Sequence, residues 1–253
     1  MKYWIVIFIV ILIGCASKGP VIDNVYEQKM PDKLLARIEL AERYLWDGAA
    51  RDALKQLLIV RDDALGYARY HFDLAMCYLA LDQKQQAIQE FQKALKQNPI
   101  YGEAWNNLGV IYLNQRKFEL AKKCFEKALS ILTYSTPELP ALNMARLYLK
   151  QGNYDQAQKY VRLSIQKNWR YADAYLFLAR LLTQEEKLEQ ANKVLQQGVE
   201  AVPEDPRLIL EYAKSLLKLG YSQKAKHWFK ELVQNYAKTK EAKVARDYLE
   251  FLP

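Results

Sequence analysis

Residues 105–129 read WNNLGVIYLNQRKFELAKKCFEKAL, and this stretch decides the fold. Its first half places apolar and small residues at i, i+3, i+4 and i+7, namely Trp105, Leu108, Gly109 and Tyr112. After a polar break at 114–117, its second half places Ala121, Phe125 and Ala128 at i, i+4 and i+7. Both spacings follow one face of a helix. Since Gly109 and Ala121 are small and Tyr112 and Phe125 are large, the stretch predicts two closely packed antiparallel helices.

This hairpin closely resembles the tetratricopeptide (TPR) consensus W-x2-L-G-x2-Y…A-x3-F-x2-A. One hairpin cannot bury its own apolar face, so further copies should stack beside it. Steps of 34 residues in both directions find the pattern again, once a two-residue insertion at Thr136-Pro137 is allowed. We therefore predict an all-α fold, a TPR superhelical solenoid. Its six helix-turn-helix repeats are expected at 34–67, 68–101, 102–135, 138–171, 172–205 and 206–239, followed by a capping helix at 240–253.

Three glycines support this repeat register. Gly48, Gly152 and Gly220 all fall at the fifteenth position of their repeats, where the first helix must end. A helix commonly ends on a residue in the left-handed conformation, which glycine adopts without strain. The chain has only nine glycines, and no alternation of strand and helix patterns is visible. Both observations argue against nucleotide-binding α/β folds.

The first residues do not belong to the repeats. Lys2 precedes an unbroken apolar run over 3–13, which is shorter than the roughly 20 residues of a spanning helix and suits a signal peptide. The run ends in Leu12-Ile13-Gly14-Cys15, which resembles the lipobox of bacterial lipoproteins. The resemblance implies a signal peptide at 1–14, and a lipidated Cys15 that begins a flexible tether over 15–33. Ala16 in place of Asp implies the outer membrane, on its periplasmic side. The alternative is an uncleaved N-terminal anchor or a cysteine that stands there by chance.

Charge and chemistry point away from nucleic acid and from catalysis. Without Lys2 the chain carries 36 basic and 29 acidic residues, and these are spread along the helices without a recognition motif. The sequence contains no G-x-x-x-x-G-K-[ST], G-x-S-x-G or H-E-x-x-H motif. His71 and His227 are expected to be structural, and Cys77 and Cys124 to be small buried residues rather than a disulfide. We expect no enzyme activity, no cofactor, no metal and no small-molecule substrate.

The function is therefore expected to reside in a surface that binds a protein. In TPR proteins the first helix of each repeat lines a concave groove, and the resemblance implies such a groove here. Its N-terminal half should be apolar, through Leu35, Ile38, Leu45, Trp46, Phe72, Met76, Leu79, Val110 and Leu113. Its C-terminal half should be basic, through Arg146, Lys150, Arg180, Lys214 and Lys218, with Leu142, Phe177 and Leu210 among them. For any single residue, packing between helices is the alternative.

The carboxylate clamp of chaperone-binding TPR proteins is absent in its usual form. That clamp needs Lys and Asn at set groove positions, where this chain has Ile38, Glu42, Phe72 and Met76. The pair Asn106-Asn107 is the only remnant, and Asn106 is included among the groove residues for that reason.

The whole pattern resembles the type IV pilus biogenesis lipoproteins (PilF/PilW-type pilotins). It combines a lipobox, a tether, six repeats and a break after the third repeat. The family's N-N-x-G motif is matched by Asn106–Gly109, and its Tyr-Pro segment loosely by Tyr134 and Pro137. The resemblance implies an adaptor whose partner is the secretin, the ring channel through which the pilus emerges.

Two other functions fit the same sequence features. One is a general envelope TPR lipoprotein that scaffolds a protease, a cell-wall enzyme or an outer-membrane assembly machine. The other is an enzyme or enzyme subunit whose active site carries no known motif. The partner that the groove binds would distinguish them.

Overall fold

The computed structural model describes residues 29–252, so the predicted signal peptide, Cys15 and most of the tether lie outside the described residues. The described part forms fourteen α-helices and no strand. The helices are α1 (Asp32–Trp46), α2 (Ala50–Ile59), α3 (Arg61–Ala64), α4 (Ala68–Ala80), α5 (Lys84–Gln97), α6 (Gly102–Asn114), α7 (Phe118–Ser130), α8 (Glu138–Lys150), α9 (Tyr154–Lys167), α10 (Ala172–Gln184), α11 (Leu188–Ala201), α12 (Pro206–Lys218), α13 (Ser222–Asn235) and α14 (Lys240–Phe251).

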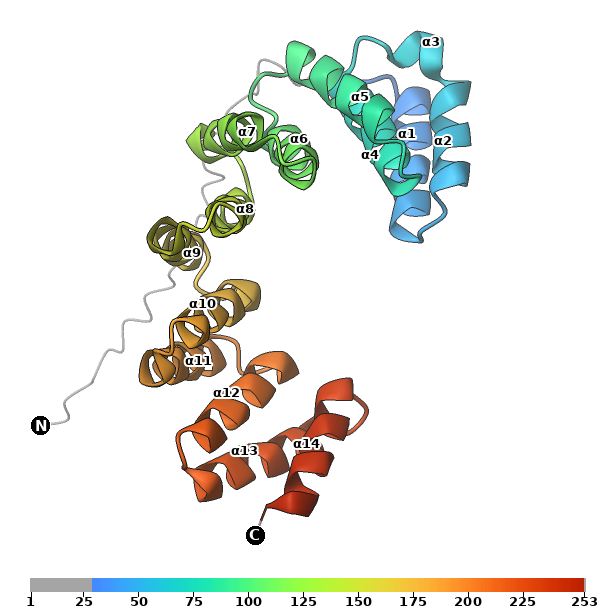
Figure 1. Ribbon diagram of the computed structural model, residues 1–253. Helices are drawn as coiled ribbons and strands as arrows, with labels where there is room; N and C mark the ends of the chain where they lie inside the picture. The colour runs from blue at the N-terminus through green and yellow to red at the C-terminus, as the bar shows by residue number, and fades with distance from the viewer. Residues whose placement is uncertain (1–28, 253) are drawn as a thin grey trace, which may run out of the picture.

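The helices pair into antiparallel hairpins that stack into an open arc (Figure 1). In the middle of the arc, α6, α8 and α10 lie on its inner side and α7, α9 and α11 on its outer side. The predicted fold class is confirmed: six hairpins are followed by α14, which packs on α12 and α13. None of the helices within residues 29–252 is both long and apolar enough to cross a membrane.

One helix, α3, lies outside the predicted pattern. It occupies the connection between the first two hairpins and holds Asp62 and Asp63 in its first turn. Negative charge at a helix N-terminus is stabilising, and the last residue, Ala64, is completely buried. The repeat template did not predict α3, because the consensus describes only the two long helices.

Each hairpin turns at a residue with left-handed backbone. The three predicted glycines have φ values of 75°, 75° and 82°. The other three repeats place a non-glycine residue at the same point, with φ of 59° for Asp82 and 60° for both Arg116 and Glu186. The left-handed conformation costs such residues about 1 kcal/mol. The turn therefore depends on its hydrogen bonds, such as the one from Lys117 N to Tyr112 O at 2.9 Å.

The core of each hairpin repeats one contact between its two helices. The twenty-fourth repeat position holds an apolar side chain of the outer helix, and in the second, third and sixth repeats it is a completely buried phenylalanine, namely Phe91, Phe125 and Phe229. In the third repeat, a Cβ atom added to Gly109 would lie 2.5 Å from Cε1 of Phe125. The two helices are therefore as close as the ring allows.

The two-residue insertion before the fourth repeat is held by packing and by hydrogen bonds. Tyr134 is buried against Gly102, where an added Cβ would lie 2.5 Å from the Tyr134 ring. At the start of α8, the backbone carbonyl of Glu138 accepts a hydrogen bond from Ser164 Oγ at 2.9 Å. The side chain of Glu138 accepts another from Asn168 at 3.1 Å. These contacts fix α8 on α9 and let the repeats continue across the insertion.

The last helix covers the open end of the sixth repeat. Ala242 and Ala245 of α14 are completely buried, and the Tyr248 ring stacks on Phe229 with 4.9 Å between ring centroids. Thr239 caps the helix, since its Oγ1 accepts a hydrogen bond from Ala242 N at 3.1 Å. A terminal repeat needs such a cover, because its outer face has no neighbour.

We expect Gly109→Ala to lower the free energy of unfolding by roughly 1–3 kcal/mol, since the new methyl group overlaps the Phe125 ring. Gly66→Ala is the matched control, because no heavy atom lies within 4 Å of the position its Cβ would take. Urea denaturation followed by circular dichroism measures both variants. Equal stability of the two would contradict the close approach of α6 and α7.

We expect deletion of 240–253 to expose Phe229 and to cost about 2 kcal/mol. For a chain of this length the Tm should then fall by roughly 4–8 °C. Deletion of 252–253 alone is the control, since it leaves α14 intact. Thermal melts of both truncated chains test this, and an unchanged Tm after the longer deletion would rule out a capping role for α14.

Candidate functional site

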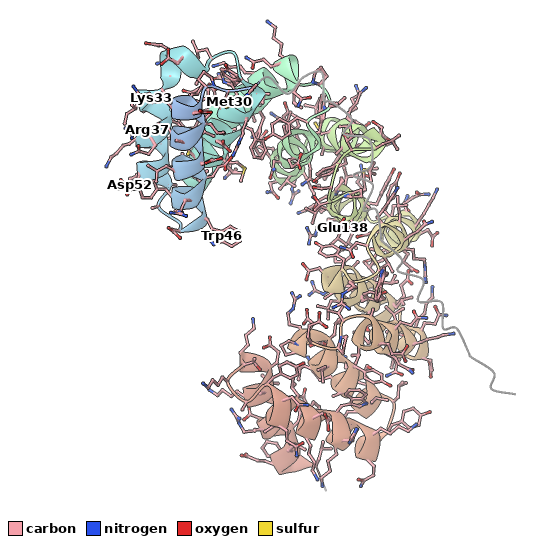
Figure 2. The ribbon with its side chains drawn as sticks, turned by 180° about the vertical axis from the view of Figure 1, so that it is seen from behind. Met30, Lys33, Arg37, Trp46, Asp52 and Glu138 are labelled. Atoms are coloured by element: carbon pink, nitrogen blue, oxygen red, sulfur yellow. The ribbon has the colours of Figure 1, made fainter. Side chains whose placement is uncertain are left out.

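The inner surface of the arc is the candidate site, and its N-terminal half is less apolar than expected. Trp46 is the most exposed of the predicted residues there, at 91%. It lies at the end of α1 that borders the hollow of the arc (Figure 2). Most of the other predicted side chains in this half are half-buried, namely Leu35, Leu45, Phe72, Met76, Leu79 and Val110.

Several predicted groove residues are buried in the stack. The fifth repeat position holds Ile38, Asn106, Leu142 and Leu210, all of which are buried. Ile38, Asn106 and Leu142 are buried within the stack, so a partner cannot reach these side chains, whereas Leu210 borders the C-terminal groove. Leu113 is also buried, at 4% exposure, because it packs in the core shared by the second, third and fourth repeats. The prediction that Ile38, Asn106, Leu113 and Leu142 contact a partner is therefore wrong.

Phe72 occupies the same fifth position and packs partly into the stack. Its ring stacks on Tyr101 with 4.8 Å between centroids and lies 5.7 Å from the Phe91 ring. Tyr101 directly precedes α6 and Phe91 belongs to α5, so the Phe72 ring packs between α5 and the connection that leads into the third repeat. Only its remaining half-exposed edge is open to a partner.

A polar cluster interrupts the N-terminal half, and the sequence did not predict it. Arg69 donates two hydrogen bonds of 2.7 Å to the carboxylate of Glu42. Asp73 is buried beside this pair at 3% exposure, and its Oδ2 has no hydrogen-bond partner. Burial, reinforced by the negative charge of Glu42, raises the pKa of Asp73 well above its usual value. The cluster joins α1 to α4, so only the fold brings its members together.

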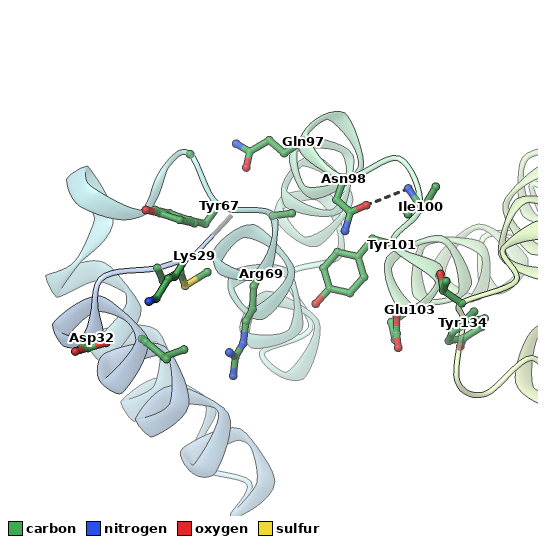
Figure 3. Close-up of a pocket in the computed structure, with 16 residues that line it drawn as sticks. Lys29, Asp32, Tyr67, Arg69, Gln97, Asn98, Ile100, Tyr101, Glu103 and Tyr134 are labelled. Atoms are coloured by element: carbon green, nitrogen blue, oxygen red, sulfur yellow. Dashed lines mark hydrogen bonds between the residues drawn. The ribbon is translucent and has the colours of Figure 1, made fainter. Parts of the chain in front are cut away.

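Arg69 also lines a cavity of about 760 Å³ (Figure 3). This cavity lies where α1, α4 and α6 begin, and its walls are polar as well as aromatic. They include Lys29, Asp32, Tyr67, Asn98, Tyr101, Glu103 and Tyr134. The N-terminal half can therefore bind polar groups as well as apolar side chains.

Asn106 has a structural role in the middle of the arc. Its Oδ1 accepts a 2.9 Å hydrogen bond from Asn143 Nδ2, across the boundary between the third and fourth repeats. Oδ1 of Asn143 in turn accepts a 2.8 Å hydrogen bond from Arg146. Buried amides need such partners, since an unpaired one costs about 1–3 kcal/mol. The pair joins α6 to α8 and holds the exposed Arg146 guanidinium at the inner surface.

The C-terminal half carries the basic groove, with a volume of about 670 Å³. Arg146, Arg180 and Lys218 line it, and they come from the three successive inner helices α8, α10 and α12. None of the three makes an ion pair within the described part of the chain. Half-buried Phe177 and Leu176 supply an apolar floor between these cations. The structure therefore brings together two of the predicted site residues, Arg146 and Arg180.

Carboxylates also line this groove, but most already have partners. Asp173 pairs with Arg207 at 2.8 Å, and Glu211 pairs with Lys214 at 2.7 Å. The predicted cation Lys214 is thus neutralised within its own helix. Arg207 was not among the predicted groove residues, although it occupies the second repeat position, as the predicted Leu35 does in the first repeat. The cations without carboxylate partners leave an excess of positive charge in the groove.

His71 and the two cysteines that the structure describes have structural surroundings, whereas His227 is exposed on α13 with its ring beside Trp228. His71 is buried, and its Nδ1 and Nε2 lie 2.6 Å from Glu90 Oε2 and 3.1 Å from Leu65 O. Although burial opposes its ionisation, hydrogen bonds from His71 and Lys93 hold the pKa of Glu90 below its usual value. Cys77 and Cys124 are buried and free, and burial raises the pKa of each thiol to about 12. No cluster of three metal-ligating side chains occurs within residues 29–252.

Solved structures show the same architecture. The chain superposes on Pseudomonas aeruginosa PilF with a TM-score of 0.67 and 20% identity, over 85% of this chain and 97% of that one. It matches PilW, described as a widely conserved type IV pilus biogenesis factor, with a TM-score of 0.67 and 22% identity, over 85% and 99% of the two chains. At these identities the likeness establishes the fold alone.

Sequence relatives match over shorter stretches. A BBSome complex member of Xenopus tropicalis, BBS4, is 25% identical over 161 residues, which are 64% of this chain and 31% of that protein. An uncharacterised protein of Haemophilus influenzae is 33% identical over 99 residues, which are 39% of this chain and 55% of that one. The chain thus spans about a third and about half of the lengths of these relatives.

Family models identify the repeats directly. Three tetratricopeptide repeat models match residues 68–101, 102–132 and 142–206. Together the matches cover more than half of the chain, and they fall on the second to fifth hairpins of the structure. The chain therefore belongs to the tetratricopeptide repeat family.

Proposed function

We propose that this protein is a lipid-anchored adaptor of the bacterial outer membrane that faces the periplasm. It binds a protein partner through the inner surface of its arc. The partner is a secretin-type channel, and the complex supports type IV pilus assembly. The chemistry needs no catalytic group, because the adaptor only carries and positions its partner.

One observation supports the binding of a protein partner. Arg146, Arg180 and Lys218 face one groove from three successive helices, and none has a carboxylate partner within the described part. Like charges at one site repel each other unless a counter-charge arrives. An acidic segment of a partner would supply that counter-charge, while Phe177 and Leu176 would accept its apolar side chains. The groove thus favours a peptide segment with both acidic and apolar residues.

The exposed N-terminal half of the arc extends the same surface. Trp46 offers a large aromatic side chain, and aromatic residues are over-represented among the side chains that dominate binding energy. Leu45 and Leu79 are further half-buried apolar side chains of the proposed binding surface. A long partner segment could therefore contact the apolar end of the arc as well as its basic end.

The lipid anchor rests on the lipobox and on general lipid chemistry. A single acyl chain gives only marginal membrane binding, whereas two or more chains give stable attachment. The lipoprotein modification of Cys15 supplies several chains. It would fix the adaptor to the membrane without any spanning helix.

The pilus assignment is supported by the likeness to PilF and PilW over nearly the full length of both. The alternative is a general envelope TPR lipoprotein that scaffolds a protease, a cell-wall enzyme or an outer-membrane assembly machine. The match to BBS4 favours the general scaffold function, because BBS4 is also a member of a protein complex. Copurification from detergent-solubilised outer membrane separates the two, since a secretin supports the first and a protease or cell-wall enzyme the second.

We expect the double charge reversal Arg180→Glu and Lys218→Glu to weaken partner binding by at least about tenfold. Both side chains are exposed, so the melting curve should stay that of the wild type. The double variant Lys159→Glu and Lys193→Glu is the charge-matched control, because both lysines are exposed on α9 and α11 at the outer side of the arc. A titration of the copurified partner measures all three chains. Undiminished binding by the double variant would exclude the basic groove as the partner site.

We expect Cys15→Ser to leave the repeats folded but to displace the protein from the outer membrane. Folding depends on the packed repeats, whereas location depends on the acyl chains. Membrane fractionation measures this, with Ser17→Ala as the control beside the lipobox. If the Cys15→Ser chain still sediments with the outer membrane, the lipid is not the anchor.

A further inference from the structure

One edge of the arc carries an unusual share of exposed apolar side chains. At this edge the outer helix of each hairpin ends and the inner helix of the next begins. Six of the twelve large hydrophobic side chains that are exposed in the described part lie there: Leu58, Ile59, Leu65, Ile100, Leu132 and Trp169. Leu132 is 99% exposed and Trp169 is 60% exposed. We call the part of this edge formed by 96–100, 127–133 and 167–170 the apolar-basic edge.

Basic residues accompany these apolar ones. The last turns of α5, α7 and α9 hold Lys96, Lys127 and Lys167 respectively. The last turns of α11 and α13 hold no basic residue, and the loop after α11 exposes Pro203 and Glu204 instead. A lysine in the last turn therefore accompanies an exposed apolar side chain at the second, third and fourth repeats, while the first repeat has Arg61 with Ile59 and Leu65.

Folding does not account for this pattern. A lysine at the end of a helix stabilises the helix dipole, which explains part of the basic charge. It does not explain why the side chain of Leu132 is almost fully in solvent. Nor does it explain the exposure of Trp169, whose ring centroid lies 5.4 Å from the Arg170 guanidinium. Ile100, Leu132 and Lys127 border one shallow pocket, so the loops of the second and third repeats form a continuous surface.

The N-terminal end of the described chain lies at the same edge. Lys29 lines one cavity together with Ile100 and Thr133 (Figure 3). Met30 and Lys33 lie at the opposite end of α1 from Trp46 (Figure 2). Lys29 follows Cys15 by only 14 positions. A segment of that length spans at most about 50 Å even when fully extended, so an anchor at Cys15 would keep this edge near the lipid surface.

We propose that the apolar-basic edge binds directly to an anionic phospholipid bilayer. Leu132, Ile100 and Trp169 insert at the interface, where tryptophan is favoured, and the three lysines contact lipid headgroups. The location of this surface next to a membrane rests on the proposed lipid anchor, but its affinity for lipid does not. Bound in this way, the edge sets the orientation of the groove relative to the membrane.

Flotation with lipid vesicles tests the proposal without any acyl chain. All the core clusters lie within residues 29–252, so a chain that begins at Ala16 keeps the whole packed fold. We expect this chain to float with vesicles of phosphatidylglycerol and phosphatidylcholine, and far less with phosphatidylcholine alone. Leu132→Asp and Trp169→Ser should each reduce binding to the anionic vesicles by about tenfold, since each removes an inserted apolar side chain.

The matched control is Leu120→Asp. Leu120 is an exposed leucine in the first turn of α7, at the other end of the helix that leads to Leu132. It should bind the vesicles as the unchanged chain does. Failure of the unchanged chain to bind anionic vesicles, or an equal loss with Leu120→Asp, overturns the proposal.

One further result would contradict the membrane proposal, and another would separate it from the proposed lipid anchor. If sedimentation without lipid shows a dimer that Leu132→Asp converts to a monomer, the edge binds a second copy and the membrane proposal is wrong. If Cys15→Ser shows that the anchor is not lipid while Leu132→Asp still abolishes vesicle binding, the edge retains its role and only the proposed anchor fails.

Discussion

The fold depends on one contact that every hairpin repeats, a large side chain of the outer helix against a small-residue face of the inner helix. In the third repeat this contact places the Phe125 ring against the backbone of Gly109. The close approach is possible only because the chain turns back through a left-handed residue such as Arg116. Because the same geometry recurs along the chain, the inner helices align. Their residues that face the hollow of the arc then form one continuous surface.

The repeat architecture could be predicted from the sequence because its signals are local. The amino-acid sequence alone shows the period of 34 residues. It also shows the helical spacing of Trp105, Leu108, Gly109 and Tyr112. The non-glycine turns at Arg116 and Glu186 were not visible, since neither residue type favours left-handed backbone. Pairs between repeats, such as Asn106 with Asn143, also escaped prediction, because they join side chains 37 positions apart.

The inner surface was predicted in outline but not in detail. The resemblance to TPR proteins placed Arg146 and Arg180 in the groove, and the structure sets both in one basic pocket. The burial of Ile38 and Leu113 depends on how neighbouring repeats rotate against each other, which no single repeat reveals. The Arg69–Glu42 pair with Asp73 likewise requires two helices to meet. Charge pairing between repeats thus decides which cations remain available to a partner.

The position of α14 at the end of the array has a consequence for the order of folding. Each hairpin packs chiefly against its neighbours in sequence, so few contacts join distant parts of the chain. Folding of such arrays can propagate from one unit to the next. During synthesis the N-terminal repeats are made first. Each hairpin can therefore pack on the previous one before the later repeats have been synthesised. The Phe229 ring stays uncovered until Tyr248 arrives, so the sixth repeat is the last to become protected from misassembly.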